Sequence, residues 1–191
     1  MKSKIKEIIV PGCVLFAICI VTSVLLAITN EVTAPKITER QEQTAIETRL
    51  EVLPNAKGGF DEAKVTFDGT EYTYHTGKNE KGEVVGYVFT TNTKGYGGNV
   101  SIMTGINTDG TVAAIETLEL NETAGLGMKA AEDDFKNMYK GKSDQVTVIK
   151  NVEPSGNQVK AITGATITSE AVTDAVNIAL NLYSEITGGA K

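Results

Sequence analysis

The sequence has few of the side chains on which protein metal centres and nucleophilic sites depend. It contains two cysteines, Cys13 and Cys19, and one histidine, His75. Both cysteines lie in the N-terminal apolar run, where on a helix they point about 120° away from each other and cannot form a disulfide. The rest of the chain therefore lacks the residues of thiolate-held iron–sulfur clusters, Cys/His zinc sites, and Cys-His or Ser-His-Asp nucleophile systems. We expect no metal site and no catalytic nucleophile, so any redox chemistry needs an organic cofactor.

Positive charge is also scarce outside the N-terminus. The chain has 18 basic and 24 acidic residues, a formal net charge of −6. Residues 1–29 carry a local charge of +2, so residues 30–191 hold 15 basic and 23 acidic side chains, a net of −8. Because an acidic domain repels phosphate backbones, nucleic-acid binding is disfavoured.

One long apolar run is present at the N-terminus. The 22 residues from Ile8 to Thr29 carry no charge, and such a helix spans a hydrocarbon core of ~30 Å. A signal peptide is the main alternative, but its apolar region is normally ~7–15 residues long, and no good small-x-small cleavage site follows this run. A lipid-modified Cys13 fits less well, because such a cysteine closes an apolar segment rather than opens one. We therefore expect an uncleaved, single-pass anchor in the cell membrane.

The charges beside this run predict its orientation. Lys2, Lys4 and Lys6 precede it, whereas acidic and basic residues are mixed after it. By the positive-inside rule, the N-terminus lies in the cytoplasm and the following domain is extracytoplasmic.

Beyond the anchor, the pattern predicts a helix, then strands, then helices. Pro35 can begin a helix that runs to Leu53 and is stopped by Pro54, a stalk between the membrane and the domain. Segments rich in Val, Tyr, Thr and Phe, separated by Asp-Gly and Lys-Gly turns, predict an antiparallel meander of strands at 64–67, 71–76, 83–90, 99–106 and 112–120. A short helix at 131–139, a strand at 145–149 and an amphipathic helix at 169–186 follow. The predicted class is α+β, divided into a transmembrane part (1–30), a stalk helix (31–55) and one domain (56–191).

Two short patterns in this domain could carry chemistry. Residues Gly125–Ala130 match the G-x-G-x-x-A skeleton of a dinucleotide-binding turn. The setting does not fit, because the surrounding strands read as hairpins rather than as β-α-β units with parallel crossovers. A glycine turn that lets the backbone approach another group is the better interpretation.

The second pattern is Thr163-Gly164-Ala165-Thr166-Ile167-Thr168-Ser169, directly before the last predicted helix. It places four hydroxyls and several backbone N–H groups at a helix N-terminus, a setting that favours an anion and a phosphate especially. The residues alone leave a simpler interpretation open: a Ser or Thr caps the helix, Glu170 complements its dipole, and nothing binds.

This second pattern resembles the covalent flavin attachment motif of the FMN-binding domain family. That family includes the G subunit of the Rnf electron-transport complex and the C subunit of the sodium-pumping NADH:quinone reductase. Two further blocks resemble the family in the same order, Gly95-Tyr96-Gly97-Gly98 and Glu122-Thr123-Ala124-Gly125-Leu126-Gly127. With the anchor and the acidic domain, the resemblance covers nearly the whole chain.

The resemblance implies FMN that a flavin transferase joins, through its phosphate, to Thr166. Glu122 and Thr123 are expected to hydrogen-bond the flavin or its ribityl chain, with Leu126 packed on the ring and Tyr96 stacked against it, although these residues also suit an ordinary turn. His75 is expected to be a strand residue without a catalytic role. The other candidate cofactor-binding residues are Thr163, Gly164, Ala165, Thr168, Ser169, Gly125 and Gly127.

Two positions differ from the family pattern. Ala124 stands where the family usually has proline, which loosens a turn but removes no functional group. Lys160 stands where an aspartate commonly lies six residues before the modified threonine. That aspartate is thought to help the transferase recognise its target, so Lys160 bears on the efficiency of modification and not on the acceptor hydroxyl.

The resemblance implies an electron-carrying subunit of a membrane-bound, ion-translocating ferredoxin:NAD oxidoreductase, acting with other subunits and turning over no substrate of its own. A subunit of the related quinone reductase and a stand-alone extracytoplasmic flavoprotein are alternatives, although the chain is shorter than the quinone-reductase subunit. From a different class, the chain could be a membrane-anchored scaffold or binding domain without a cofactor, in which Thr166 only caps a helix.

Overall fold

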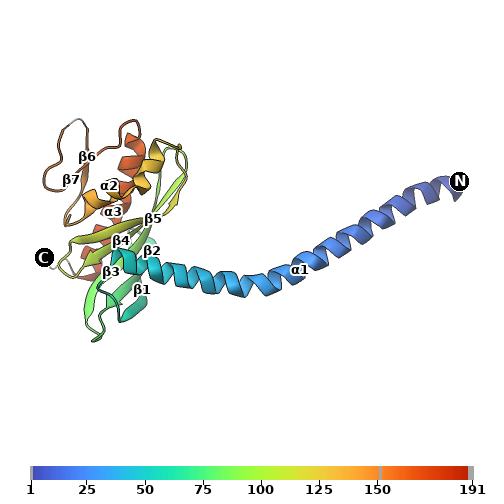
Figure 1. Cartoon of the computed structure of the whole chain (residues 1–191), viewed down its shortest axis with the longest axis horizontal. Helices are drawn as coiled ribbons and strands as arrows, with labels where there is room; N and C mark the ends of the chain where they lie inside the picture. The colour runs from blue at the N-terminus through green and yellow to red at the C-terminus, as the bar shows by residue number, and fades with distance from the viewer. Residues whose placement is uncertain (1, 151, 189–191) are drawn as a thin grey trace. The chain divides into compact units, whose positions relative to one another are not determined.

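The computed structural model describes residues 2–150 and 152–188, except for the side chains of residues 2–11, 13, 14, 17, 32 and 35–41. The chain divides into two compact units, Met1–Ile46 and Glu47–Lys191. The elements, in chain order, are α1 (Lys2–Val52), β1 (Gly59–Phe67), β2 (Thr70–Lys78), β3 (Val84–Lys94), β4 (Asn99–Asn107), β5 (Val112–Leu120), the 3₁₀ helix η1 (Gly127–Ala131), α2 (Asp133–Lys136), the 3₁₀ helix η2 (Asn137–Tyr139), β6 (Thr147–Ile149), β7 (Gln158–Lys160) and α3 (Thr166–Ile186) (Figure 1).

All described residues of the first unit belong to helix α1. The sequence predicted two helices here, the second beginning at Pro35, and that division was wrong because α1 continues through this position. A proline removes one N–H donor from the helical ladder, and in a helix of 51 residues the turns on either side persist. In the part of the chain that the structure describes, no helix is long and apolar enough to cross a membrane. The side chains of Ile8–Pro11, at the start of the predicted span, lie outside the described residues.

The second unit is built on a five-stranded antiparallel meander, β1-β2-β3-β4-β5, as the strand pattern predicted. The first hairpin shows how the sequence sets the register. Phe67 pairs with Thr70, and the two residues between them, Asp68 and Gly69, have φ values of 47° and 73°. Positive φ at both positions of a two-residue loop is the type I′ turn that Asp-Gly favours.

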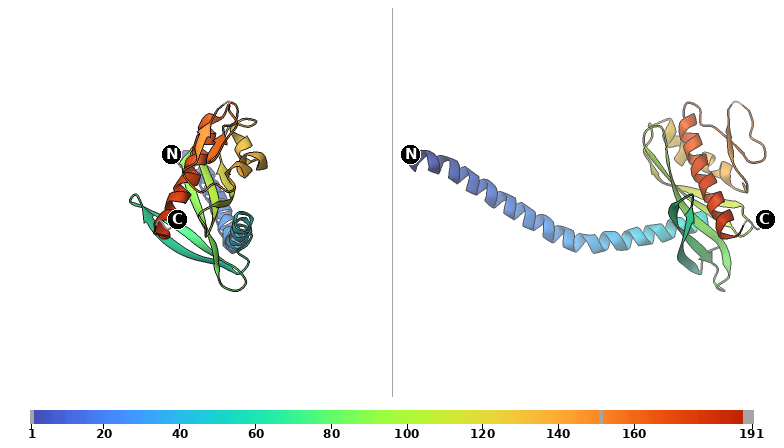
Figure 2. Two further views of the ribbon diagram at one scale, coloured as in Figure 1. Left: turned by 90° about the vertical axis from the view of Figure 1, so that its left-hand side faces the viewer. Right: turned by 180° about the vertical axis from the view of Figure 1, so that it is seen from behind.

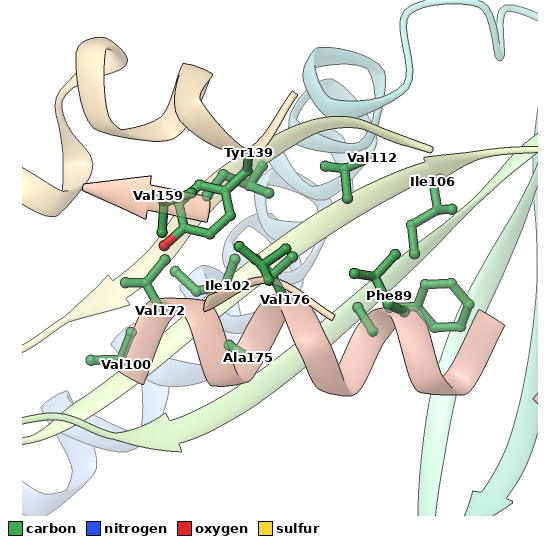
Figure 3. Packing of buried hydrophobic residues seen from close by; sticks show 14 of the residues in the cluster. Phe89, Val100, Ile102, Ile106, Val112, Tyr139, Val159, Val172, Ala175 and Val176 are labelled. Atoms are coloured by element: carbon green, nitrogen blue, oxygen red, sulfur yellow. The ribbon is translucent and has the colours of Figure 1, made fainter. Parts of the chain in front are cut away.

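Helix α3 covers one face of the sheet, where it packs against β3 and β4 (Figure 2). Its predicted apolar stripe is confirmed: Val172, Ala175 and Val176 are fully buried, and Figure 3 shows them beside Ile102 of β4. Two strand threonines add polar contacts to this apolar interface. Thr91 Oγ1 donates to Ala175 O at 2.9 Å and Thr93 Oγ1 to Ala171 O at 2.8 Å. These bonds satisfy hydroxyls that burial would otherwise penalise, so α3 is fixed along the sheet.

The opposite face receives the end of α1 and the turn that follows it. Val52 and Leu53 are buried there against Val88 and Met103. Glycine in the sheet makes this approach possible, since a Cβ on Gly105 would lie 2.1 Å from Val52 O. The last turn of α1 is therefore part of the domain core.

Two short regions differ from the sequence prediction. The expected helix at 131–139 is three short pieces, η1, α2 and η2, and the expected strand at 145–149 is shortened to β6. Strand β7, which pairs parallel to β6, was not predicted. A strand of three residues is too short to show periodicity, and its partner, rather than its own sequence, defines it.

Candidate functional site

Three glycine-containing turns meet at the start of α3 and enclose a cleft of about 570 Å³. They are the β3–β4 turn at 95–98, the segment after β5 at 121–127, and the turn at 162–165. The volume is within the range of roughly 300–1,000 Å³ that is typical of small-molecule sites. The cleft is lined by Tyr96, Glu122, Thr123, Leu126, Gly127, Gly164, Ala165, Thr166, Ile167 and Thr168.

The β3–β4 turn is glycine-rich because another segment lies against it. A Cβ on Gly95 would lie 2.1 Å from Glu122 Oε1, and one on Gly97 would lie 2.6 Å from Asn121 O. Both contacts are shorter than any real Cβ makes, so these glycines serve close approach rather than an unusual φ. The turn leaves the Tyr96 side chain 72% exposed at the cleft.

The segment after β5 forms a tight turn. The N–H of Leu126 donates to Thr123 O at 3.2 Å, and Gly125, the third residue of the turn, has φ 77°. Left-handed φ at that position is what a type II turn requires and what glycine supplies. Proline is favoured at the second position of such a turn, which Ala124 occupies here.

A similar turn leads into α3. The N–H of Ala165 donates to Ile162 O at 2.9 Å, and Gly164, again the third residue, has φ 80°. A Cβ on Gly164 would lie 3.2 Å from Leu126 Cδ2, so the two turns touch through this leucine. Ser169, fully buried, secures the second turn: its Oγ accepts the N–H of Ile162 at 2.9 Å and donates to Ala165 O at 3.0 Å.

The start of α3 corrects the capping interpretation. The helix begins at Thr166, its N-cap is Ala165, and no described side chain makes a capping hydrogen bond. The alternative in which a Ser or Thr caps this helix was therefore wrong for the structure, because Ser169 lies inside the helix and its hydroxyl bonds the preceding turn. Within the described chain, the first backbone N–H groups of α3 have no side-chain acceptor, and such groups favour an anion.

The hydroxyls of the motif occupy different environments. Thr166 is half-buried and lines the cleft; Thr168 also lines it but is only 1% exposed. Thr163 is exposed and, like Gly125 and Ser169, is not among the lining residues. The remaining nine predicted site residues all line the cleft. Sequence reasoning missed Ile167, 49% exposed at the cleft, whose signal was an apolar residue on the outer face of the helix start.

Two other sequence features have a plain structural setting. The G-x-G-x-x-A pattern at 125–130 runs from a turn into η1 after an antiparallel strand, which is not the β-α-β setting of a dinucleotide site. His75 lies in β2, with its Nε2 3.7 Å from Glu62 Oε2. Among the described residues, no group of three or more His, Cys, Asp or Glu side chains is arranged to hold a metal ion.

Two known protein families match parts of the chain. Residues 95–181 match the family described as FMN-binding domain, and residues 1–52 match the family described as RnfG N-terminal region. The first match includes all three turns of the cleft.

Relatives match over most of their length. The G subunit of the Na(+)-translocating ferredoxin:NAD(+) oxidoreductase complex of Acetobacterium woodii is 39% identical, over 92% of this chain and 91% of that protein. The G subunit of the proton-translocating ferredoxin:NAD(+) oxidoreductase complex of Clostridium ljungdahlii is 33% identical, over 90% and 89%. The G subunit of an ion-translocating oxidoreductase complex of Methanosarcina acetivorans is 31% identical, over 96% and 98%.

Solved structures share the fold at lower identity. NqrC of Shewanella oneidensis superposes with a TM-score of 0.56 at 17% identity, covering 66% of this chain and 69% of that one. The C subunit of the Na(+)-translocating NADH-quinone reductase of Parabacteroides distasonis gives 0.57 at 18% identity, covering 80% and 98%. The predicted α+β class, with helices on an antiparallel sheet, is confirmed.

Proposed function

The chain belongs to the family of G subunits of ion-translocating oxidoreductase complexes, and we propose that it carries electrons, through FMN, within a membrane-bound ferredoxin:NAD oxidoreductase that translocates ions. The observation that carries this proposal is the near full-length similarity to such subunits, combined with a cleft that lies inside the FMN-binding domain. The quinone-reductase alternative has less support. The solved C subunits of quinone reductases are only 17–18% identical to this chain, so the similarity shows a shared fold and no more.

The residues of the cleft fit FMN. An uncapped helix start offers backbone N–H groups to a phosphate, and this favourable field offsets the repulsion of a net-negative domain. Gly127 and Gly164 line the cleft beside it, and Tyr96, Leu126 and Ile167 present apolar surface for a ring system. The cleft therefore combines one anion-binding end with apolar walls.

We infer that the cofactor is attached covalently, as a phosphate ester of Thr166 Oγ1 made by a flavin transferase. Thr166 is supported as the acceptor because its hydroxyl belongs to a half-buried residue of the cleft, at the first position of α3. Thr168 is nearly fully buried, and Thr163 lies outside the cleft. The other hydroxyl, that of Ser169, is used to hold the turn.

Each remaining part of the site then has a role in holding the group. Ser169 fixes the turn from which Thr166 projects, while Thr123, Leu126 and Tyr96 border the space for the ribityl chain and the ring. FMN, when bound, accepts and donates electrons. The protein contributes its position and the dielectric and hydrogen bonds that tune its potential.

We propose further that residues 8–29 anchor the chain in the cell membrane as a single span, with the N-terminus cytoplasmic and the FMN domain extracytoplasmic. The support is the 22-residue uncharged run, the lysines before it, and the match of residues 1–52 to an N-terminal region of the same subunit family. Other subunits of the complex are the partners to which this domain passes electrons.

Denaturing gel electrophoresis under ultraviolet light tests the proposal. The full chain, produced in cells with an active flavin transferase, should give a fluorescent band after denaturation, and the band should be dark without the transferase. A dark band in both cases would contradict covalent FMN and favour a scaffold without a cofactor.

A further inference from the structure

Glu122 makes a contact that a simple flavin ligand would not make. Its two carboxylate oxygens accept the backbone N–H groups of consecutive residues in the β3–β4 turn: Tyr96 N–H to Oε1 at 2.7 Å and Gly97 N–H to Oε2 at 3.2 Å. Bonds to an ionised acceptor are stronger than those between neutral groups. The carboxylate therefore binds a turn that lies 25 residues or more away in the sequence.

Two glycines lie close to this carboxylate. Gly95 lies on one side, where a Cβ would be 2.1 Å from Oε1. Gly127 lies on another, where a Cβ would be 2.8 Å from Glu122 Cβ, 2.9 Å from Oε2 and 2.9 Å from Thr168 Oγ1. Glu122, which is half-buried, thus contacts the β3–β4 turn, and Gly127 lies between Glu122 and Thr168 of α3.

The two N–H groups that Glu122 accepts are those of Tyr96 and Gly97. These bonds therefore fix the backbone that carries the Tyr96 ring. Tyr96 is 72% exposed at the cleft, so little of it is packed against other residues. Its backbone is held from one side by Glu122 and within the turn by the N–H of Gly95, which donates to Gly98 O at 2.8 Å. Without the carboxylate, the backbone N–H groups of Tyr96 and Gly97 would lose these bonds, and the Gly95–Gly98 bond would remain within the turn.

We propose that Glu122 is a positioning residue: it braces the 95–98 turn against the segment after β5 and so holds Tyr96 at the edge of the FMN cleft, rather than serving as a hydrogen-bond partner of the flavin. The flavin part of this proposal rests on the proposed function. The brace itself is a property of the folded chain and is present before any cofactor binds.

The brace also places a negative charge at the cleft. Reduction adds negative charge to a flavin, so a nearby carboxylate opposes it and lowers the reduction potential. Position and charge are separable, because Glu122→Gln removes the charge and replaces one acceptor by a donor, whereas Glu122→Asp keeps the charge and shortens the reach by one methylene.

The test uses the full chain in detergent, produced without the transferase, as wild type, Glu122→Gln, Glu122→Asp and the control Glu119→Gln. Hydrogen exchange is followed by mass spectrometry on a peptide covering residues 94–99, with peptides from β4 reporting the integrity of the fold. Both Glu122 variants should exchange this peptide at least about tenfold faster, given the strength of bonds to charged acceptors. The control, whose carboxylate bonds Asn99 and Asn121 side chains instead, should match wild type.

The potential of flavin-loaded protein is the second readout. It should rise in Glu122→Gln and stay nearer wild type in Glu122→Asp. Wild-type exchange in either Glu122 variant would overturn the brace. If the wild type carries no flavin even with its transferase, the proposed function fails, and the exchange measurement still decides the brace.

Discussion

At the scale of single residues, the segment 163–169 places four similar hydroxyls in different environments. Thr163 is exposed outside the cleft, and Thr166 is half-buried within it. Thr168 is nearly fully buried, and the Ser169 hydroxyl makes two hydrogen bonds. The sequence places all four within seven positions; the turn at 162–165 carries Thr163, and the first turn of α3 holds the other three at different degrees of burial.

Replacing Thr166 by valine tests the acceptor. Valine keeps the β-branched shape and removes the hydroxyl, so we expect a folded protein, within about 0.5 kcal/mol of wild-type stability as for surface substitutions in general, that carries no covalent FMN. The mass of the intact protein, produced with its transferase, is the measurement. Thr163→Val is the matched control and should keep the adduct. If Thr163→Val loses the adduct and Thr166→Val keeps it, Thr166 is not the acceptor.

A substitution at Ala124 should stabilise the domain. It is exposed, occupies the second position of the turn from Thr123 to Leu126, and its N–H is not a donor in the backbone bonds of that turn. Proline at such a position reduces the conformational entropy of the unfolded chain, so Ala124→Pro should stabilise the domain by about 0.4–1 kcal/mol. Chemical denaturation measures this. A destabilised variant would show that the turn does not have the φ that proline requires.

At the scale of elements, the end of α1 and the first two strands share a small charged cluster. His75 of β2 has a side chain only 14% exposed, and Glu62 of β1 lies 3.7 Å away. Burial first, and the Arg49 guanidinium second, lower the pKa of His75 below its usual 6.5, against the opposing effect of Glu62. The folded state therefore binds this proton less readily than the unfolded chain does.

This cluster predicts a pH dependence of stability. The His75 contribution is fully present above the unfolded pKa of 6.5 and is lost as the pH falls below that value towards the folded pKa. The free energy of unfolding should therefore decline between about pH 7 and pH 5, and His75→Gln should decline less. Urea unfolding of both proteins across this range gives the comparison. Parallel pH profiles would mean that the charged form of His75 is accommodated in the folded state.

Some of these elements could be predicted from the sequence, and others could not. The meander and the stripe of α3 were predictable because alternation and 3.6-residue periodicity extend over many residues. The contacts of Gly95, Gly97 and Gly127 were not, since a glycine that allows close approach looks the same in sequence as one that allows a positive φ. The continuity of α1 through Pro35 was missed because proline is favoured at the start of a helix and disfavoured in its interior, so it indicated a boundary that α1 does not have.

At the scale of the whole molecule, the proposed span divides the chain into a basic cytoplasmic start and an acidic domain on the other side of the membrane. The three lysines lie before the uncharged run, and the net charge after it is −8. A reporter that is active only in the cytoplasm, fused after Lys191, should therefore be silent, whereas one active only outside should function. Strong cytoplasmic activity would contradict the orientation and the proposed partners together.

The order of the three turns along the chain has a consequence for synthesis. The 95–98 turn and the segment after β5 are made well before the turn at 162–165 and α3, the helix that covers the sheet. Until α3 has been made, the sheet face that will bury Ile102 and Phe89 remains bare. A nascent chain that ends before residue 162 thus lacks the third turn of the cleft, and its apolar sheet face is uncovered. The covering of the sheet and the completion of the cleft therefore occur at the same stage of synthesis.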